Sequence, residues 1–171
     1  MKSFLLCLFL IAVGCLLIGS APMSGTTSAS AAATADNLSA ATNQELARAR
    51  NATAKYHDVA RAEADGYVNS GFSPGEGFEY VNEGLIDCDF DPEEPEILLY
   101  AFVPSENHLR LVGVEYVVPL QCSQDAPEGF SGDADVWRED SEGFGLWELA
   151  AWLWLHNSNG IFADPPHPRV P

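Results

Sequence analysis

The sequence predicts a single α+β domain in which a small antiparallel sheet, built on a central hairpin, is covered by two helices. Three observations support this fold class. Two apolar runs flank a polar segment between residues 96 and 120, which is the pattern of a hairpin. An N-terminal amphipathic stripe precedes it, and an apolar Trp-rich segment follows it at residues 146–157. A length of 171 residues with 47% hydrophobic residues suits one domain with a real core.

Residues 1–35 have the pattern of a secretory signal peptide and its cleavage region. Lys2 supplies a positive charge, and about fifteen apolar residues follow it, which is short for a membrane-spanning helix. Small-residue cleavage sites occur at 29–31 and 33–35. A lipid anchor at Cys15 ranks second, because apolar residues follow this cysteine where a polar tether is usual. We expect a secreted, periplasmic or cell-surface protein with a flexible linker at 36–41 and one folded domain at 42–171.

The chain is strongly acidic, with 25 Asp and Glu residues against 8 Lys and Arg and a formal net charge of -17. This balance argues against binding to nucleic acid or to an anionic membrane surface, because both require a basic patch. It suits a cationic small ligand or a divalent cation as partner. The alternative is an acidic surface that serves solubility alone.

The first folded element is predicted to be an amphipathic helix that covers one face of the hairpin. Thr42 and Glu45 have the spacing of a capping box, and apolar residues then recur every three or four positions until Gly66 ends the helix. Glu63 falls at the end of the apolar stripe, where exposure of a charged residue is favoured over burial.

A glycine-rich turn at 71–77 then leads into a short strand at 78–82. The acidic loop at 87–95 begins with D-x-D-x-D, as a calcium loop does. Its sixth and twelfth positions are Pro92 and Leu98, however, so it is not an EF-hand loop. A solvated acidic loop and an irregular calcium site both remain open.

The central hairpin is predicted to have a five-residue loop at 104–108. If Val103 faces Leu109, then Ile97 faces Glu115, and both faces of the hairpin are largely apolar. Glu115 therefore lies among aliphatic side chains. A buried acid must be paired, hydrogen-bonded or protonated, because an isolated charge in an apolar setting is costly.

Cys88 and Cys122 are the cysteines that follow the signal region, and we expect them to form a disulfide. An exported protein meets an oxidising compartment, and the hairpin register brings residue 90 opposite Cys122. Free thiols or a metal pair are the alternatives, although two cysteines are too few for a structural zinc site.

The C-terminal part is predicted to consist of three segments. Residues 121–143 are polar and read as a long surface loop. Residues 146–157 are apolar nearly all round and are predicted to be a buried helix that covers the other face or the end of the sheet. Residues 161–171 contain four prolines and should run extended along the surface.

Several short motifs carry a resemblance to a known family. They are A-T-A-K-Y-x-D-V with A-D-G-Y at 52–67, G-x-G-x-x-Y-x-N at 75–82, D-P-x-x-P-E at 91–96, V-E-Y at 114–116 and W-x-W-x-x-N-x-x-G-x-F at 152–162. From about residue 50 onward the chain resembles a family of small exported bacterial proteins of uncharacterised activity. The resemblance implies histidines at two positions that are Glu79 and Ala150 here, so it implies no histidine-based site in this chain. It implies no activity, cofactor or partner.

The candidate ligand-binding residues are Glu79, Tyr80, Glu115 and Tyr116, which combine carboxylates with aromatic neighbours. The 4 histidines lack the local spacing of metal ligands, and no catalytic motif of a hydrolase or nucleotide-binding protein occurs. No catalytic residue, metal ligand or cofactor is identified, and whether the protein is an enzyme stays open.

The sequence favours a non-enzymatic domain that binds a small ligand or a divalent cation. The first alternative is a carboxylate-based hydrolase that uses Glu79 and Glu115, because paired acids at different depths can act as acid and base. The second is a secreted interaction protein with an exposed patch around Trp147, Trp152 and Trp154. A purely structural role for Glu115 in the core is the competing interpretation.

Overall fold

The computed structural model describes residues 38–140 and 143–171. The predicted signal peptide and residues 36–37 of the predicted linker lie outside the described residues, whereas residues 40 and 41 of that linker belong to the first helix. The described chain is a mixed α+β structure in the order α1 (Ala40–Thr53), a 3-10 turn (Ala54–His57), α2 (Val59–Ala64) and then six strands. The predicted fold class is therefore confirmed in its coarse form, although strands make up more of the structure than predicted.

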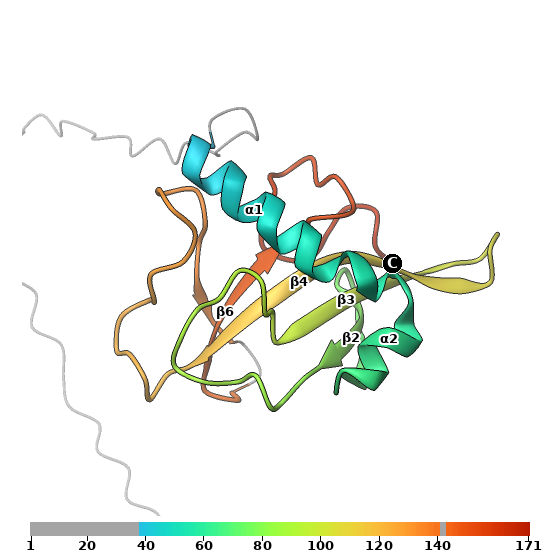
Figure 1. Cartoon of the computed structure of the whole chain (residues 1–171), viewed down its shortest axis with the longest axis horizontal. Coiled ribbons are helices and arrows are strands. Elements are labelled where there is room, and N and C mark those ends of the chain that lie inside the picture. Colours follow the sequence, from blue (N-terminus) through green and yellow to red (C-terminus); the bar gives the residue numbers. More distant parts are fainter. Residues whose placement is uncertain (1–37, 141–142) are drawn as a thin grey trace, which may run out of the picture. The chain divides into compact units, whose positions relative to one another are not determined.

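All six strands belong to one antiparallel sheet with the spatial order β1-β2-β3-β4-β6-β5 (Figure 1). Their bounds are β1 (Val68–Ser73), β2 (Gly77–Val81), β3 (Ile97–Val103), β4 (His108–Pro119), β5 (Arg138–Glu139) and β6 (Leu146–Ala151). The central strands β3 and β4 are apolar on both faces, which requires cover on both sides.

The hairpin of β3 and β4 has the predicted register in its inner half and a different one near its tip. Ile97 faces Glu115 and Leu99 faces Gly113 as predicted, but Tyr100 faces Leu111, and Val103 faces His108. An irregularity between Leu99 and Tyr100 shifts the pairing by one residue and shortens the loop to residues 104–107. The prediction was wrong there because a bulge leaves no mark in an alternating apolar pattern.

The predicted Trp-rich helix at 146–157 is wrong, because its first half is strand β6 and the rest is irregular chain. β6 pairs with β4 along six residues, from Val114 with Ala151 to Pro119 with Leu146. A segment that is apolar on all sides fits a strand buried between two covered faces as well as a buried helix. This segment forms a strand because the edge of β4 offers a row of backbone donors and acceptors with which it can pair.

The N-terminal helix begins earlier than predicted and is broken once. Ser39 caps α1 by accepting from the amide of Thr42, whereas Glu45 accepts from the amide and hydroxyl of Ser131 in a distant loop. The predicted capping box is thus wrong. Asp58 interrupts the helix and caps α2, and Gly66 at φ 100° follows its end as predicted.

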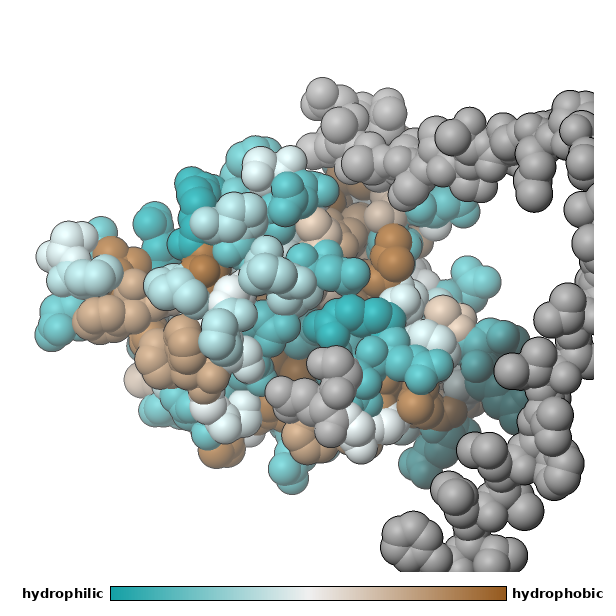
Figure 2. All heavy atoms as spheres, turned by 180° about the vertical axis from the view of Figure 1, so that it is seen from behind, coloured by the Kyte–Doolittle hydropathy of each residue, from teal (hydrophilic) through white to brown (hydrophobic). Residues whose placement is uncertain are grey.

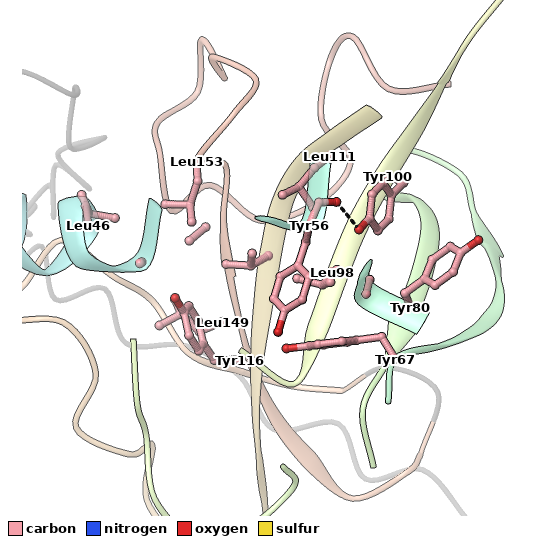
Figure 3. Packing of buried hydrophobic residues seen from close by; sticks show 14 of the residues in the cluster. Leu46, Tyr56, Tyr67, Tyr80, Leu98, Tyr100, Leu111, Tyr116, Leu149 and Leu153 are labelled. Carbon is pink, nitrogen blue, oxygen red and sulfur yellow. Dashed lines mark hydrogen bonds between the residues drawn. The ribbon is translucent and has the colours of Figure 1, made fainter. Parts of the chain in front are cut away.

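The main core lies between α1, α2 and one face of the sheet (Figure 3). Leu46 of α1 and the tyrosines at 56, 67, 80, 100 and 116 belong to this cluster, together with Leu98, Leu111 and Leu149. The hydroxyl of Tyr100 donates to the carbonyl of Tyr56 at 2.6 Å, which attaches the 3-10 turn to β3. A smaller apolar cluster around Leu99, Val112 and Val117 lies on the other face.

A disulfide and a pair of backbone hydrogen bonds hold segments outside the sheet in place. Cys88 and Cys122 form the predicted disulfide, with Cα atoms 5.4 Å apart. At the C-terminus the amide of Gly75 donates to the carbonyl of Pro171, and the amide of His167 donates to the carbonyl of Gly75. The C-terminal segment is therefore held against the turn between β1 and β2.

Candidate functional site

Glu115 is a buried carboxylate in the middle of the sheet, as the hairpin register predicts. Its residue is 3% exposed, and it faces Ile97 on β3 and Ala150 on β6. It points away from the tyrosine-rich core, because the neighbouring Val114 and Tyr116 belong to that core and side chains alternate along a strand. This acid therefore projects into the face of the sheet opposite α1.

Arg138 on the short strand β5 is the cation that meets Glu115. Its Nη2 lies 3.0 Å from Glu115 Oε1, and its Nη1 lies 2.5 Å from Glu148 Oε2. Weaker contacts join Nη2 to Glu76 at 3.7 Å and Nε to Asp164 at 3.6 Å. One guanidinium thus serves four carboxyl groups, so acidic groups outnumber cations in the cluster.

Strand pairing brings these residues together from distant parts of the chain. Arg138 pairs with Glu148 across β5 and β6, and Glu148 pairs with Val117 on β4. Glu148 is hence the diagonal cross-strand neighbour of Glu115, close enough for long side chains to interact. The sequence analysis missed Arg138 and Glu148, because one was assigned to a surface loop and the other to a helix.

Glu79 and Glu76 extend the cluster on the side of β2. Glu79 faces Leu99 on β3 and accepts a hydrogen bond from the hydroxyl of Ser73. Glu76 lies in the turn before β2 and reaches Arg138. The predicted pair of Glu79 and Glu115 therefore does share one face of the sheet.

The two predicted tyrosines do not share that face. Tyr80 and Tyr116 are buried in the main core on the helix side, and the Tyr116 hydroxyl donates to the carbonyl of Pro92 at 2.9 Å. The alternation of side chains along a strand separates each tyrosine from its glutamate neighbour. The prediction of a site formed by all four residues is thus wrong for Tyr80 and Tyr116, which organise the core.

A cleft of about 430 Å³ opens over the carboxylate cluster. Among the described residues, five glutamates and one arginine line it: Glu76, Glu79, Glu83, Glu115, Glu148 and Arg138. Its other walls are largely apolar and include Ile86, Ile97, Val117, Phe144 and Leu146. In Figure 1 α1 crosses in front of the sheet, so Figure 2 shows the opposite side, where strongly hydrophilic residues gather near the middle among hydrophobic ones. We call this cavity the carboxylate cleft.

The electrostatics of the cleft favour protonated carboxyl groups. Burial raises the pKa of Glu115 well above its ordinary range, and the charges of Glu148 and Glu76 raise it further against the effect of Arg138. Burial also raises the pKa of Glu76 to about 7, aided by its hydrogen bond with Glu79 and the charge of that residue. Burial lowers the pKa of Arg138, but the surrounding carboxylates outweigh this effect and raise it. Both shifts favour the protonated forms of Glu115 and Glu76, while Arg138 stays charged.

Glu96 is a second buried acid, and the sequence analysis did not select it. It is 3% exposed, and its Oε2 accepts from the amide of Val117 at 3.0 Å. Burial raises its pKa to about 8, against the lowering effect of that hydrogen bond. Its position directly before an apolar strand was the available signal, but Glu96 satisfies a backbone donor and does not line the cleft.

The remaining candidates have structural explanations. Glu63 is exposed near the end of α2. In the acidic loop, Asp87 and Asp91 accept from backbone amides two residues ahead. Within residues 38–140 and 143–171, no group of three or more His, Cys, Asp or Glu side chains is arranged to hold a metal ion.

The tryptophans do not form the exposed patch that the sequence suggested for an interaction protein. Trp152 is buried, with its Nε1 donating to the carbonyl of Ala163 at 2.8 Å. Trp147 and Trp154 are partly buried, and Trp147 Nε1 donates to the carbonyl of Ser123. The apolar side chains of this segment therefore pack against the rest of the protein and do not form a surface patch.

Comparison with models of protein families, with curated proteins and with solved structures finds no match for this chain. None of the helices in the described part has the length and apolar character needed to cross a membrane. The disulfide between Cys88 and Cys122 is compatible with a secreted or periplasmic protein.

Proposed function

We propose that the protein is an exported, non-enzymatic binding domain whose carboxylate cleft takes a small organic cation. The observation that carries this proposal is the placement of buried Glu115 and Arg138, its one cationic partner in the described chain, in an open cleft with further glutamates. A ligand with an ammonium group would supply the positive charge that Arg138 alone does not.

The composition of the cleft favours an organic cation over a bare metal ion. Apolar walls such as Ile97, Val117 and Phe144 offer contact to a hydrocarbon body, while the glutamates offer acceptors to its charged end. A volume of about 430 Å³ lies within the range of small-molecule sites. A divalent cation, the other ligand that the acidic composition suits, is included in the test below.

The proposal is tested by calorimetry at pH 8 with 2-phenylethylamine as the probe and with calcium and magnesium chloride in parallel. We expect the amine to bind and the Glu115→Gln variant to bind about tenfold more weakly, because one charge partner is lost at a cost of about 1.4 kcal/mol. Glutamine keeps the shape of the side chain, so the variant should remain folded.

Glu63→Gln is the matched control, because it removes the same charge from an exposed position on α2. Its affinity for the amine should equal that of the unaltered protein. Equal loss in both variants would show a nonspecific effect of net charge and contradict the proposal. Binding of calcium or magnesium in place of the amine would assign the cleft to a divalent cation.

Hydrolysis is the second candidate, because Glu79 and Glu115 face one cleft, and burial raises the pKa of Glu115. Glu79 on β2 and Glu115 on β4 are separated by strand β3 and are offset by two residues along the strand direction. Their Cα atoms are therefore about 12 Å apart. A substrate would therefore lie between them without direct contact of the two carboxyl groups. Cleavage of nitrophenyl glycosides that is lost in both Glu79→Gln and Glu115→Gln would support this candidate over simple binding.

A further inference from the structure

A second pocket, of about 310 Å³, lies between α1 and the chain that follows β6. These two segments are in direct contact, since Arg50 Nε donates to the carbonyl of Leu153 at 3.1 Å. The pocket shares no lining residue with the carboxylate cleft. Its apolar walls come from Leu38, Leu46, Leu153 and Ile161. We call it the α1 pocket.

Arg50 is a half-buried cation in the wall of this pocket. Arg48 and Lys55 form ion pairs with Glu93 and Asp65, but no carboxylate of the described chain forms one with Arg50. Apart from the bond of its Nε to Leu153, the guanidinium meets no acceptor among the described residues. A partly desolvated charge of this kind gains from an anionic partner.

Two residues of the pocket wall carry buried donors that lack acceptors among the described residues. Asn157 is 3% exposed, and its Oδ1 accepts from the amide of Asn159 at 2.9 Å. Its Nδ2 is buried without a partner among the described residues, and so is Nε1 of Trp154. A buried donor without an acceptor costs about 1–3 kcal/mol, which a bound acceptor would remove.

We propose that the α1 pocket binds a small organic carboxylate. Its carboxylate would accept from the Arg50 guanidinium and from the side chains of Asn157 and Trp154, while its apolar body contacts Leu46 and Ile161. A cation and two donors without acceptors favour an anion, and apolar walls favour one with a hydrocarbon body over a strongly hydrated inorganic ion.

The acidic character of the chain does not prevent this binding. At physiological ionic strength charges are screened over about 8 Å, so the net charge of -17 acts weakly at a site that lacks nearby carboxylates. The carboxylate cleft lies on the sheet face opposite α1. The two pockets therefore suit ligands of opposite charge. Binding at one pocket does not depend on binding at the other.

The test is an NMR titration of the ¹⁵N-labelled protein with sodium phenylacetate in physiological salt. We expect saturable shifts of the Trp154 indole N–H and of the Asn157 side-chain amide. The indole N–H of Trp147 lies outside the pocket and should not move. Saturable shifts confined to residues of the carboxylate cleft, or none at millimolar phenylacetate, would overturn the proposal.

Ligand controls separate the charge from the hydrocarbon body. Phenylacetamide, which has the same ring without the charge, should bind at least about tenfold more weakly, because it lacks the ion pair. Inorganic phosphate should also bind more weakly than phenylacetate. Equal binding of the amide, or tighter binding of phosphate, would contradict a carboxylate site with apolar walls.

Variants on one helix provide the decisive comparison. Arg50→Gln should weaken phenylacetate binding at least about tenfold, whereas Arg48→Gln, two residues earlier on α1 and paired with Glu93, should leave it unchanged. Asn157→Asp keeps the acceptor for the Asn159 amide and places a negative charge in the pocket, so it should abolish binding. Unchanged affinity in Arg50→Gln or in Asn157→Asp would overturn the proposal.

Discussion

Arg138 is the residue on which the charge balance of the carboxylate cleft depends. It contacts Glu115 and Glu148 directly and reaches Glu76 and Asp164. Without it, buried carboxyl groups must take up protons or remain charged without a partner, and either is unfavourable. Its side chain is 25% exposed, so water already screens part of this interaction.

We predict that Arg138→Met lowers the free energy of unfolding by about 1–3 kcal/mol at pH 8, because buried carboxylates lose their partner. The loss should be smaller at pH 5. The pKa of Glu115 is raised already and rises further without Arg138, so the folded state keeps its proton at low pH. Urea unfolding at both pH values measures this. A loss of stability that is larger at pH 5 than at pH 8 would contradict this prediction. So would a double variant, Arg138→Met with Glu115→Gln, in which the loss at pH 8 is as large as in Arg138→Met alone.

Glu96 gives a second prediction at the scale of one residue. Its folded-state pKa of about 8 lies above the ordinary value of 4.5, so the folded protein binds the proton more tightly than the unfolded chain. The contribution of Glu96 is therefore fully present below about pH 4.5 and is lost as pH rises to about 8. Thermal unfolding of Glu96→Gln should show a smaller loss of stability across this window than the unaltered protein. An identical pH profile in both would refute the assignment.

Among the elements, the hairpin could be predicted from the sequence and strand β6 could not. Alternating apolar runs around a polar loop identify β3 and β4, and their register places Glu115 inside. Residues 146–151 carry no alternation that separates strand from helix, because apolar residues fall on both faces and Glu148 alone interrupts them. Only the pairing with β4, which lies 27 to 37 positions earlier in the chain, settles their structure.

The same reason explains which parts of the candidate site could be predicted. Glu79 and Glu115 lie on strands with clear patterns, so their common face follows from register. Tyr80 and Tyr116 were assigned to the site as sequence neighbours, although alternation sends them to the opposite face. Arg138 lies in a polar segment without periodicity, and its pairing with Glu148 is a tertiary contact that no local signal records.

The disulfide is the element-scale feature with the most direct effect on stability. Cys88 and Cys122 are separated by 34 positions and link the acidic loop to the chain after β4. Replacing both by alanine should lower the free energy of unfolding by about 3–4 kcal/mol, because the unfolded chain regains loop entropy. Denaturant unfolding of the double variant measures the change. A loss below about 1 kcal/mol would show that hydrogen bonds such as Tyr116 to Pro92 hold the loop without the disulfide.

At the scale of the whole molecule, the sheet separates two kinds of surface. One face carries α1, α2 and the tyrosine-rich core, and the other carries the carboxylate cleft. The excess of acidic residues in the chain is thus matched by a cleft that concentrates carboxyl groups and also has apolar walls. A solvated surface alone would not require a buried glutamate in the central strand.

The most direct test of the central claim is the pH dependence of 2-phenylethylamine binding, measured by calorimetry between pH 6 and pH 8. The amine stays protonated over this range, whereas the carboxyl cluster loses protons, with Glu76 at a pKa of about 7 and that of Glu115 raised. We predict that affinity rises about tenfold with pH and that binding releases protons, since the cation displaces them. Affinity that is constant or falls as pH rises would contradict a cation site in the carboxylate cleft.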